Sequence, residues 1–447
     1  MTAAGTRVVV IGAGSAGAVV ASRLSEHPSF AVALLEAGPD ERAADVPPAV
    51  RGPSFVDAIE TPGRTWPDLI ATRSSGQAPR RYLRGRGVGG SSSINALVAL
   101  PGEPGDYDDW QRQHGCAGWS WRDVGEWFHR TRLVLNRASI DEWGGVNAAL
   151  GAAVAEAAGG VPLTRDRTGA RVSVNDAYIE PARGRDGLLI VGDSLVDRVV
   201  FEGRRAVGVR TVAGDEIEAD LVVVSAGAIH SPAILLRSGV DTPGVGANLH
   251  DHPSFPIAIQ LHEPARPGRL PIATLAQLSS PDAHHDLQLL PIDGVDRTMP
   301  HLGLLMAALM RTHSRGSVRL ENDDATIDPV VDFAMLDDER DWPGMMAAID
   351  AAERALDHPA MRALGDVVPY DRSPAGVRAA LGDYVHAAGT CAMGTVVDSS
   401  CRLVGYEGVV VCDASVMPQA PRANTHLPTV MIAERIAAMI TAEHASP

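Results

Sequence analysis

Three glycines near the start of the chain, Gly12, Gly14 and Gly17, form a GxGxxG motif. The motif follows an apolar stretch, residues 7–11, and precedes an apolar stretch with the character of a helix. In this position the first glycine turns the chain, the second lets the backbone approach a pyrophosphate, and the third lets the helix pack on the strand. The free N–H groups at the start of the helix favour negative charge. The motif therefore predicts a nucleotide site, and a tight turn without a ligand is the alternative.

Glu36 is placed to complete this nucleotide site. It follows Gly17 by 19 residues and ends the next predicted strand, residues 31–36. A carboxylate at this position accepts hydrogen bonds from an adenosine ribose. The same negative charge disfavours a 2′-phosphate, which argues against NADP and leaves NAD and FAD as candidates.

A second glycine- and serine-rich segment, residues 84–95, has the sequence RGRGVGGSSSIN. Backbone amides in such a segment can converge on an anion and form a nest for a phosphate or a flavin edge. A flexible linker is the alternative. The two arginines and the Ile-Asn-Ala-Leu run that bracket the segment favour the nest.

The segments around these motifs predict a doubly wound α/β nucleotide domain. The strand, helix and strand at the start of the chain form a βαβ unit, and the apolar helix of this unit ends at Leu24. A meander of short strands is expected next, followed by a buried strand and its helix, and a last buried strand precedes a closing helix. The predicted ranges are 187–191, 197–202, 206–212 and 216–218 for the meander, 220–225 and 231–238 for the buried strand and its helix, and 408–412 and 428–441 for the last pair.

Three further stretches lie between these pieces of the nucleotide domain. Helices are predicted over residues 119–130 and 146–158. Residues 43–81 are rich in proline and glycine, too irregular for regular secondary structure and too long for a simple connection. We expect this stretch to cross a surface or to cover a ligand. The wide separation of the nucleotide-domain pieces indicates that a second domain is inserted between them.

The composition is that of an acidic, ordinary globular chain. Its 447 residues include 55 Asp and Glu against 39 Lys and Arg, a net charge of −16, and 45% are hydrophobic. The negative charge argues against nucleic acid and anionic membrane surfaces as partners. No apolar run approaches the ~18 residues of a membrane helix. The first residues also lack the unbroken apolar stretch of a signal peptide, so we expect a cytoplasmic protein without a membrane span.

We predict no disulfide, metal or catalytic role for the cysteines or for a pair of adjacent histidines. The four cysteines show neither dense pairing nor a CxxC pattern, which predicts reduced thiols. His284 and His285, beside Asp286, resemble a metal site in composition. Because neighbouring residues of an extended segment point to opposite faces, however, we predict no metal.

Taken together, these motifs resemble the glucose-methanol-choline (GMC) family of FAD-dependent alcohol oxidoreductases. Residues 84–95 are similar to the first signature of that family. Residues 227–240, GAIHSPAILLRSGV, are similar to the second, although Asp241 stands where the family usually has glycine. Further landmarks match at residues 245–253, at 314–318 and from His386 to the end of the chain. The resemblance therefore spans almost the whole sequence.

The resemblance implies a Rossmann-like FAD-binding domain built from discontinuous segments, with an inserted α+β substrate-binding domain. The implied division is 1–100, 186–255 and 378–447 for the FAD-binding domain, and 101–185 and 256–377 for the substrate-binding domain. The implied cofactor contacts are Gly12, Gly14, Ser15, Gly17 and Glu36 at the ADP half, Arg86, Gly89, Gly90, Ser91 and Asn95 along the pyrophosphate and isoalloxazine, Val196 near the adenine, and Asp413 and Ala414 near the ribityl chain or pyrophosphate. Some members tether FAD through a histidine where this chain has Ile94, so we predict a non-covalent cofactor.

Two histidines are the implied catalytic residues. When a hydride passes from an alcohol carbon to flavin N5, a base must also take the hydroxyl proton, and the near-neutral pKa of imidazole suits that task. The resemblance implies that His386, in HAAGT, is this base. It implies that His426, in NTHLPT, hydrogen-bonds the alkoxide and fixes the alcohol carbon over N5. Pro428 suits the first turn of the closing helix, so His426 should lie just before that helix.

The chain is shorter than most members of the family, and the missing length falls between Phe128 and Val146 and between Pro253 and Asp286. In relatives both regions cover the flavin or shape the substrate entrance, so we expect a more open pocket or one closed by another subunit. The expected activity is that of an alcohol oxidase or dehydrogenase that passes electrons to oxygen, a quinone or another carrier, and the oligomeric state stays open. The alternatives are an FAD-containing hydroxynitrile lyase and a trimmed, non-catalytic FAD-binding protein.

Overall fold

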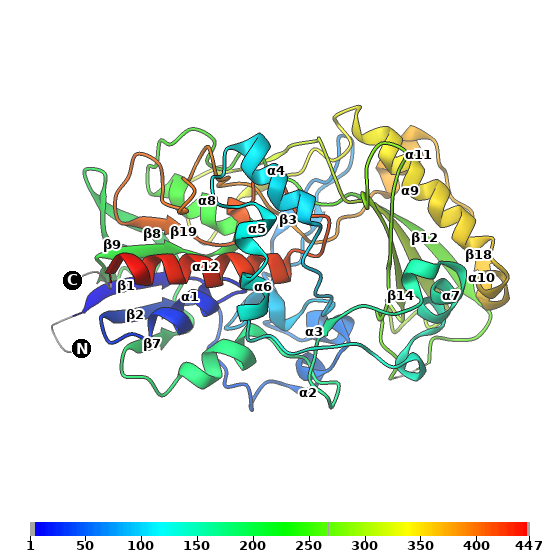
Figure 1. Cartoon of the computed structure of the whole chain (residues 1–447), viewed down its shortest axis with the longest axis horizontal. Helices are drawn as coiled ribbons and strands as arrows, with labels where there is room; N and C mark the ends of the chain where they lie inside the picture. The colour runs from blue at the N-terminus through cyan, green and yellow to red at the C-terminus, as the bar shows by residue number, and fades with distance from the viewer. Residues whose placement is uncertain (1–4, 267, 445–447) are drawn as a thin grey trace.

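The computed structural model describes residues 5–266 and 268–444 of the chain. Two sheets lie toward opposite ends of the long axis of the molecule (Figure 1). A parallel sheet lies near the two chain ends, and an antiparallel sheet lies at the other end, beside helices from the middle of the chain.

Five parallel strands form the first sheet. In spatial order they are β19 (Val409–Val411), β11 (Leu221–Val224), β1 (Thr6–Ile11), β2 (Phe30–Leu35) and β7 (Leu188–Val191). β11 and β19 are buried at every position and consist almost wholly of valine, as expected for strands that are covered on both faces. The predicted doubly wound α/β domain is confirmed.

Helices from distant parts of the chain pack around this sheet. α1 (Gly17–Leu24) lies beside the closing helix α12 (His426–His444), and Arg23 is joined to Glu434 by an ion pair of 2.7 Å (Figure 1). α8 (Gly227–Arg237) follows β11 directly. α12 begins earlier than predicted, because His426 is its first residue and not the residue before it. Pro428 fits within the first turn, where its missing N–H is not needed.

A three-stranded antiparallel meander, β8 (Val196–Glu202), β9 (Arg205–Thr211) and β10 (Glu216–Glu218), forms as predicted. The prediction that residues 187–191 belong to this meander is wrong. They form β7, which pairs in parallel with β2, Leu188 opposite Val32. A four-residue apolar run looks the same in either kind of sheet, so its sequence did not show which partner it would take.

The second sheet has five strands and forms the core of the inserted part of the chain. In spatial order they are β13 (Ala276–Leu278), β14 (Leu287–Asp293), β15 (Leu302–Leu309), β12 (Ser254–Leu261) and β18 (Gly365–Val367). All neighbours in this sheet are antiparallel. α9 (Asp341–Leu356) packs on β14 and β15. Three other helices of this region are α7 (Gly145–Ala153), α10 (Pro359–Leu364) and α11 (Pro374–Ala380) (Figure 1).

Shorter elements complete the described chain. The short helices are α2 (Pro48–Arg51), α3 (Phe55–Glu60), α4 (Pro104–His114), α5 (Trp121–Val124) and α6 (Trp127–Arg130), with helical turns at Gly90–Ser93, Ile140–Glu142, Ala155–Ala157, Asn175–Ile179, Glu180–Ala182 and Ala414–Val416. The remaining strands, each of two or three residues, are β3 (Ile70–Ala71), β4 (Arg80–Arg81), β5 (Leu135–Asn136), β6 (Leu163–Thr164), β16 (Ser317–Arg319) and β17 (Val330–Asp332).

Two predicted stretches differ from the structure. Residues 43–81 were expected to lack regular structure, but they include α2, α3, β3 and β4. The single helix predicted over residues 119–130 is divided into α5 and α6. Ser120 starts α5 in a capping box with Asp123, and Gly125 caps the end of this helix. The apolar pattern that predicted one helix therefore belongs to two short helices.

The predicted domain boundaries stay a proposal. All five strands of the parallel sheet come from the segments proposed for the FAD-binding domain. Residues 101–185 were proposed for the other domain, yet Tyr107, Trp110, Trp119 and Tyr178 pack in the hydrophobic core around the parallel sheet. The packing therefore favours assigning much of this segment to the domain of the parallel sheet.

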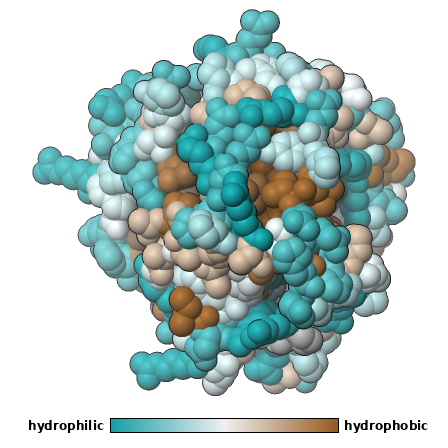
Figure 2. Space-filling model, turned by 90° about the vertical axis from the view of Figure 1, so that its right-hand side faces the viewer, coloured by the Kyte–Doolittle hydropathy of each residue, from teal (hydrophilic) through white to brown (hydrophobic). Residues whose placement is uncertain are grey.

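Several surface and core features complete the description. Within residues 5–266 and 268–444, no helix is long and apolar enough to cross a membrane. All four cysteines are buried and free. On the face at the right-hand end of Figure 1, hydrophobic residues gather in a hollow that hydrophilic residues border (Figure 2).

Candidate active site

A cavity of about 510 Å³ lies at the carboxyl ends of the parallel strands. Gly12 follows β1 directly, Glu36 follows β2, and Asp413 comes shortly after β19, and all three line the cavity. Ligands bind at this edge in open α/β sheets. Leu290 of β14 and Met306 of β15 line it as well, so the antiparallel sheet contributes part of the wall.

Most of the predicted cofactor contacts line this cavity. They are Gly12, Gly14, Ser15, Glu36, Gly90, Ser91, Asn95, Val196, Asp413 and Ala414. Three others do not. Gly17 begins α1, Gly89 donates its N–H to the Ala13 carbonyl at 2.9 Å, and Arg86 donates to the Ala37 carbonyl at 2.8 Å. These three residues support the loops around the cavity.

The two glycine-rich loops touch each other at Gly14 and Gly90. Gly90 has a φ of +50°, and a Cβ there would lie 2.7 Å from Gly14 Cα. Gly12 has a φ of +93°, and its Cβ would lie 2.6 Å from the Ser225 carbonyl oxygen. At Gly14 the nearest atom to an added Cβ is 3.9 Å away, so the protein backbone itself does not require glycine there. The bare Gly14 instead leaves room beside the start of α1, where a pyrophosphate would approach.

Glu36 joins the two loops at the end of β2. Its carboxylate is buried and accepts hydrogen bonds from the N–H groups of Ala13 at 2.8 Å, Gly38 at 3.0 Å and Gly87 at 3.0 Å. A carboxylate offers about four lone-pair positions, so it can accept another hydrogen bond from a ribose hydroxyl. Glu36 therefore holds the glycine loops together and can still contact a nucleotide.

Asp413 connects the end of β19 to the start of α8. Its buried carboxylate accepts hydrogen bonds from the Gly227 N–H at 2.8 Å and from the Ser231 hydroxyl at 2.5 Å. The Ser415 N–H donates a third at 2.7 Å. Burial raises the pKa of Asp413, and these hydrogen bonds oppose that rise only in part. Asp413 therefore ties the end of β19 to the segment that resembles the second family signature.

Arg171, which the sequence did not single out, holds Asn95 at the cavity wall. Its Nη1 donates to the Asn95 carbonyl and to the Asn95 Oδ1, each at 2.7 Å. Arg171 is buried, and burial lowers its pKa to about 9. No motif surrounds Arg171 in the sequence, because its role depends on residues more than seventy positions away.

These residues fit an FAD molecule in the cavity. The volume lies in the range of roughly 300–1,000 Å³ that ligand pockets occupy. Gly14 leaves the backbone open at the start of α1, and Glu36 and Asp413 place carboxylates at two separate strand ends. Ile94, the position for which the resemblance implied a tethering histidine in some family members, also lines the cavity.

His386 lies in the wall of this cavity, with hydrogen-bonding partners on both ring nitrogens. Its Nδ1 is 3.0 Å from His252 Nδ1, and its Nε2 is 3.3 Å from Asn424 Nδ2. Its backbone N–H donates to Asp251 at 2.9 Å. Burial lowers the pKa of His386 well below its ordinary value, and His252 and Arg84 add to the effect. The imidazole is therefore neutral at neutral pH.

His426 lies at the start of α12 and lines the same cavity. Its Nδ1 is 3.0 Å from the Ser15 hydroxyl oxygen. Its Nε2 is buried and has no hydrogen-bond partner among the described residues. Burial lowers the pKa of His426 to about 4, with a smaller contribution from Arg171. A buried imidazole nitrogen without a partner beside a cavity is placed to bind a ligand.

Three polar residues near these histidines were missed or misread in the sequence. The Tyr384 hydroxyl and Asn424 Oδ1 are buried without partners among the described residues, and both side chains line the cavity. His252, which the sequence did not single out, is buried against His386. Asn424 lies in the NTHLPT motif and His252 in the landmark at residues 245–253, whereas nothing local marked Tyr384.

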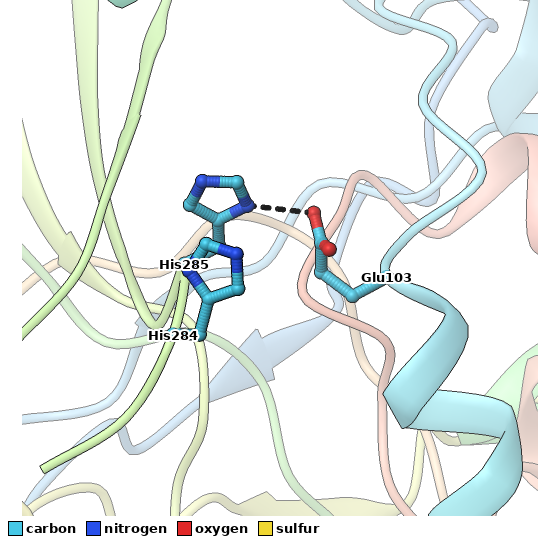
Figure 3. A group of neighbouring side chains, drawn as sticks. All are labelled: Glu103, His284 and His285. Carbon is cyan, nitrogen blue, oxygen red and sulfur yellow. Dashed lines mark hydrogen bonds and ion pairs between the residues drawn. The ribbon is translucent and has the colours of Figure 1, made fainter.

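The interpretation of His284 and His285 is wrong in its geometry. They were expected to point to opposite faces of an extended segment. Instead, the two rings lie against each other, with centroids 3.8 Å apart and planes tilted by 35°, and His285 Nδ1 is 2.9 Å from Glu103 Oε1 (Figure 3). His285 has a φ of +49°, so the backbone turns here and both side chains project to one side.

Comparison with known proteins places this arrangement in a family. Residues 6–162 and 155–254 match the N-terminal domain of the GMC oxidoreductase family, and residues 312–433 match its C-terminal domain. The crystal structure of pyridoxine 4-oxidase from Mesorbium loti matches with a TM-score of 0.89 at 24% identity, covering 98% of this chain and 99% of that one. That likeness supports the fold.

Two relatives match over nearly their whole length. The chain is 30% identical over 529 residues to 5-(hydroxymethyl)furfural oxidase of Methylovorus sp. (strain MP688), covering 96% of this chain and 97% of the relative. It is 31% identical over 533 residues to oxygen-dependent choline dehydrogenase of Xanthomonas axonopodis pv. citri (strain 306), covering 96% and 94%. Both alignments are longer than the 447 residues of this chain, which therefore lacks segments that these relatives carry. The chain belongs to the GMC oxidoreductase family and is an FAD-dependent oxidoreductase.

Proposed function

We propose that this oxidoreductase converts a neutral, largely apolar alcohol into an aldehyde or ketone, with FAD held non-covalently. The proposal is carried by two buried, neutral imidazoles, His386 and His426, that line the same cavity as the glycine loops. When bound, FAD supplies the hydride acceptor. The relatives described above are oxidases and a dehydrogenase, and they lend no support to the hydroxynitrile-lyase or non-catalytic alternatives.

His386 is the proposed base. The Asn424 amide nitrogen can only donate, so its approach to Nε2 favours the tautomer in which His386 carries its proton on Nδ1 and donates it to His252. An alcohol hydroxyl that takes the place of the Asn424 amide at Nε2 can give its proton to this lone pair. Burial keeps this imidazole unprotonated at neutral pH, so the lone pair does not already carry a proton when the substrate arrives.

His426 is the proposed positioning partner. When the Ser15 hydroxyl donates to Nδ1, the proton of the neutral ring lies on Nε2, which has no other partner among the described residues. This N–H can donate to the alcohol oxygen and so hold the alcohol carbon toward the reaction partner. Ser15 is thereby part of the glycine loop and also orients the His426 ring.

The substrate class follows from the wall opposite the glycine loops. Ile272, Leu290, Ile292 and Met306 line the cavity there. Of the described residues that line it, three carry carboxylates, and each is already bonded: Glu36 and Asp413 as above, and Asp383 to Arg73 at 2.7 Å. Although Phe55, Trp66 and Tyr384 also line the cavity, a quaternary ammonium would find no unpaired carboxylate among these residues. We therefore propose a neutral alcohol of the hydroxymethylfurfural type in preference to choline.

An anaerobic absorbance titration of the FAD-loaded protein tests this proposal. Neutral aryl and aliphatic alcohols should bleach the flavin bands, and choline should bleach them slowly or not at all. His386→Ala should slow the bleaching about 100-fold or more. His262→Ala, which changes an exposed imidazole that does not line the cavity, is the matched control. Fast recolouring in air would identify oxygen as the acceptor, and slow recolouring a quinone or another carrier. Equal bleaching rates in wild type and His386→Ala would contradict the assigned base.

A further inference from the structure

A cluster of three side chains, Glu103, His284 and His285, lies outside the cavity. One ligand atom from each residue lies within 4.8 Å of the other two. Glu103 immediately precedes α4, and the two histidines lie in the turn between β13 and β14 (Figure 3). None of the three lines the cavity. The cluster therefore brings together two parts of the chain and lies outside the proposed site of alcohol oxidation.

We propose that Glu103, His284 and His285 bind a divalent transition-metal ion of the zinc type. Two imidazole nitrogens and one carboxylate oxygen are a donor set that zinc uses, whereas Mg²⁺ and Ca²⁺ prefer oxygen ligands throughout. In a zinc site with bonds of about 2.0–2.2 Å, the ligand atoms lie roughly 3.3 Å apart. Small side-chain rotations bring the observed atoms to that spacing, and His285 Nδ1 and Glu103 Oε1, at 2.9 Å, are already close.

The turn that carries the histidines is held in shape by its own hydrogen bonds. The Ser279 hydroxyl oxygen accepts the His285 N–H at 3.0 Å and lies 3.0 Å from His284 Nδ1. Asp286 is buried and accepts from the Ser280 N–H and hydroxyl, each at 2.7 Å. With the turn closed in this way, the two imidazoles stay on one side, which two histidines on a flexible loop would not do.

Buried Arg422 fixes the histidine turn relative to Glu103. Its Nε donates to Asp106 at 2.7 Å, and its Nη1 donates to the His284 carbonyl. Asp106 in turn accepts the backbone N–H of Glu103 at 2.9 Å. The same arginine side chain therefore anchors both halves of the cluster, and the three ligands are largely positioned before a metal arrives.

Solvent reaches this cluster, so an ion can enter. The side chains of His285 and Glu103 are 32% and 22% exposed, and His284 is exposed. An ion bound here would tie the β13–β14 turn to α4. Because Arg422 lies two residues before Asn424, it would also stiffen the segment that leads to the active site.

Zinc binding to the untagged, FAD-loaded, chelator-treated protein tests the proposal by isothermal titration calorimetry. Wild type should bind one equivalent of Zn²⁺ and melt a few degrees higher with it, and Mg²⁺ should produce neither effect. Glu103→Gln, His284→Ala and His285→Ala should each weaken Zn²⁺ binding at least tenfold. His262→Ala, which alters an exposed imidazole 3.4 Å from a single carboxylate, should bind Zn²⁺ as wild type does.

Two outcomes would overturn the proposal. One is the absence of Zn²⁺ binding by the folded wild-type protein at a Zn²⁺ concentration of about 0.1 mM. The other is unchanged binding by the double variant His284→Ala/His285→Ala, which would place the metal elsewhere. Asp251, His252 and His386 form the other such cluster among the described residues, and zinc bound there would abolish alcohol oxidation. Retained flavin absorbance in each variant shows that the protein is folded, so a loss of zinc binding is then specific to the cluster.

Discussion

The Nδ1 atoms of His252 and His386 lie 3.0 Å apart in the interior of the protein. Both imidazoles are buried, and burial lowers the pKa of His252 to about 4 and that of His386 well below its ordinary value. Two neutral rings can share this contact only if one donates and the other accepts. Asn424 on the opposite side of His386 favours His386 as the donor. We therefore infer that His252 is a positioning residue, which sets the tautomer of the proposed base.

Two substitutions of His252 distinguish a role in positioning His386 from a role in packing. His252→Leu fills the space but removes the acceptor, and we expect kcat to fall about tenfold or more, as for other residues that orient a catalytic imidazole. His252→Asn offers an amide oxygen near the former Nδ1 position and should retain most of the activity. The measurement is the pH profile of kcat/KM, whose acidic limb should move only in the leucine variant. Identical profiles for both variants and wild type would remove His252 from the mechanism.

Gly14→Ala distinguishes a glycine needed by the cofactor from one needed by the fold. An added Cβ at Gly14 has 3.9 Å to its nearest neighbour, whereas at Gly90 it would lie 2.7 Å from Gly14 Cα. The apo form of Gly14→Ala should therefore melt at the wild-type temperature while its FAD content falls. Gly90→Ala should lower the melting temperature as well. Full FAD occupancy in purified Gly14→Ala would show that no phosphate approaches this residue.

Stability should depend on pH through His426. Its pKa is about 4 in the folded protein and about 6.5 when exposed. Between these values the unfolded chain binds more protons, so this residue makes the folded state less stable as the pH falls from 6.5 to 4. The difference corresponds to about 3 kcal/mol. Chemical denaturation of wild type and His426→Asn at pH 7 and pH 4 should show a larger loss for wild type. An equal loss in both proteins would mean that His426 titrates normally.

Tyr384 is expected to contact the substrate. Its hydroxyl is buried, lines the cavity and has no partner among the described residues. Tyr384→Phe should leave the melting temperature unchanged or slightly higher, because an unpartnered buried hydroxyl is lost. KM should rise several-fold for alcohols that carry a second polar group and stay constant for purely aliphatic ones. A uniform change for both kinds of alcohol would assign Tyr384 a packing role only.

The local motifs were predictable because their chemistry is contained in a few consecutive residues. The glycines of the first loop and Glu36 lie within one βαβ unit, whose geometry follows from its sequence pattern. Buried strands such as Val409–Val411 were equally predictable, since a run of valines is typical of a strand that is buried on both faces. The family resemblance supplied what these patterns alone did not, namely the choice of FAD and of the two histidines.

Features that depend on distant contacts were not predictable. His252 acquires its role from a residue 134 positions away, and Arg171 from one 76 positions away. The adjacent histidines were misplaced because the left-handed backbone at His285 is imposed by the surrounding turn and not by histidine itself. β7 took a parallel partner for the same reason, since pairing is decided by the whole sheet.

The position of β11 between β1 and β19 has a consequence for how the protein is made. β11 pairs on one side with β1 and on the other with β19, so its two neighbours come from opposite regions of the sequence. A ribosome that has translated up to residue 400 has already released β1, β2 and β11, but β19 and α12 do not yet exist. During this interval an edge of β11 is unpaired, and the antiparallel domain is free to fold first. The flavin site, whose lining includes Asp413 and His426, is therefore incomplete until synthesis is nearly finished.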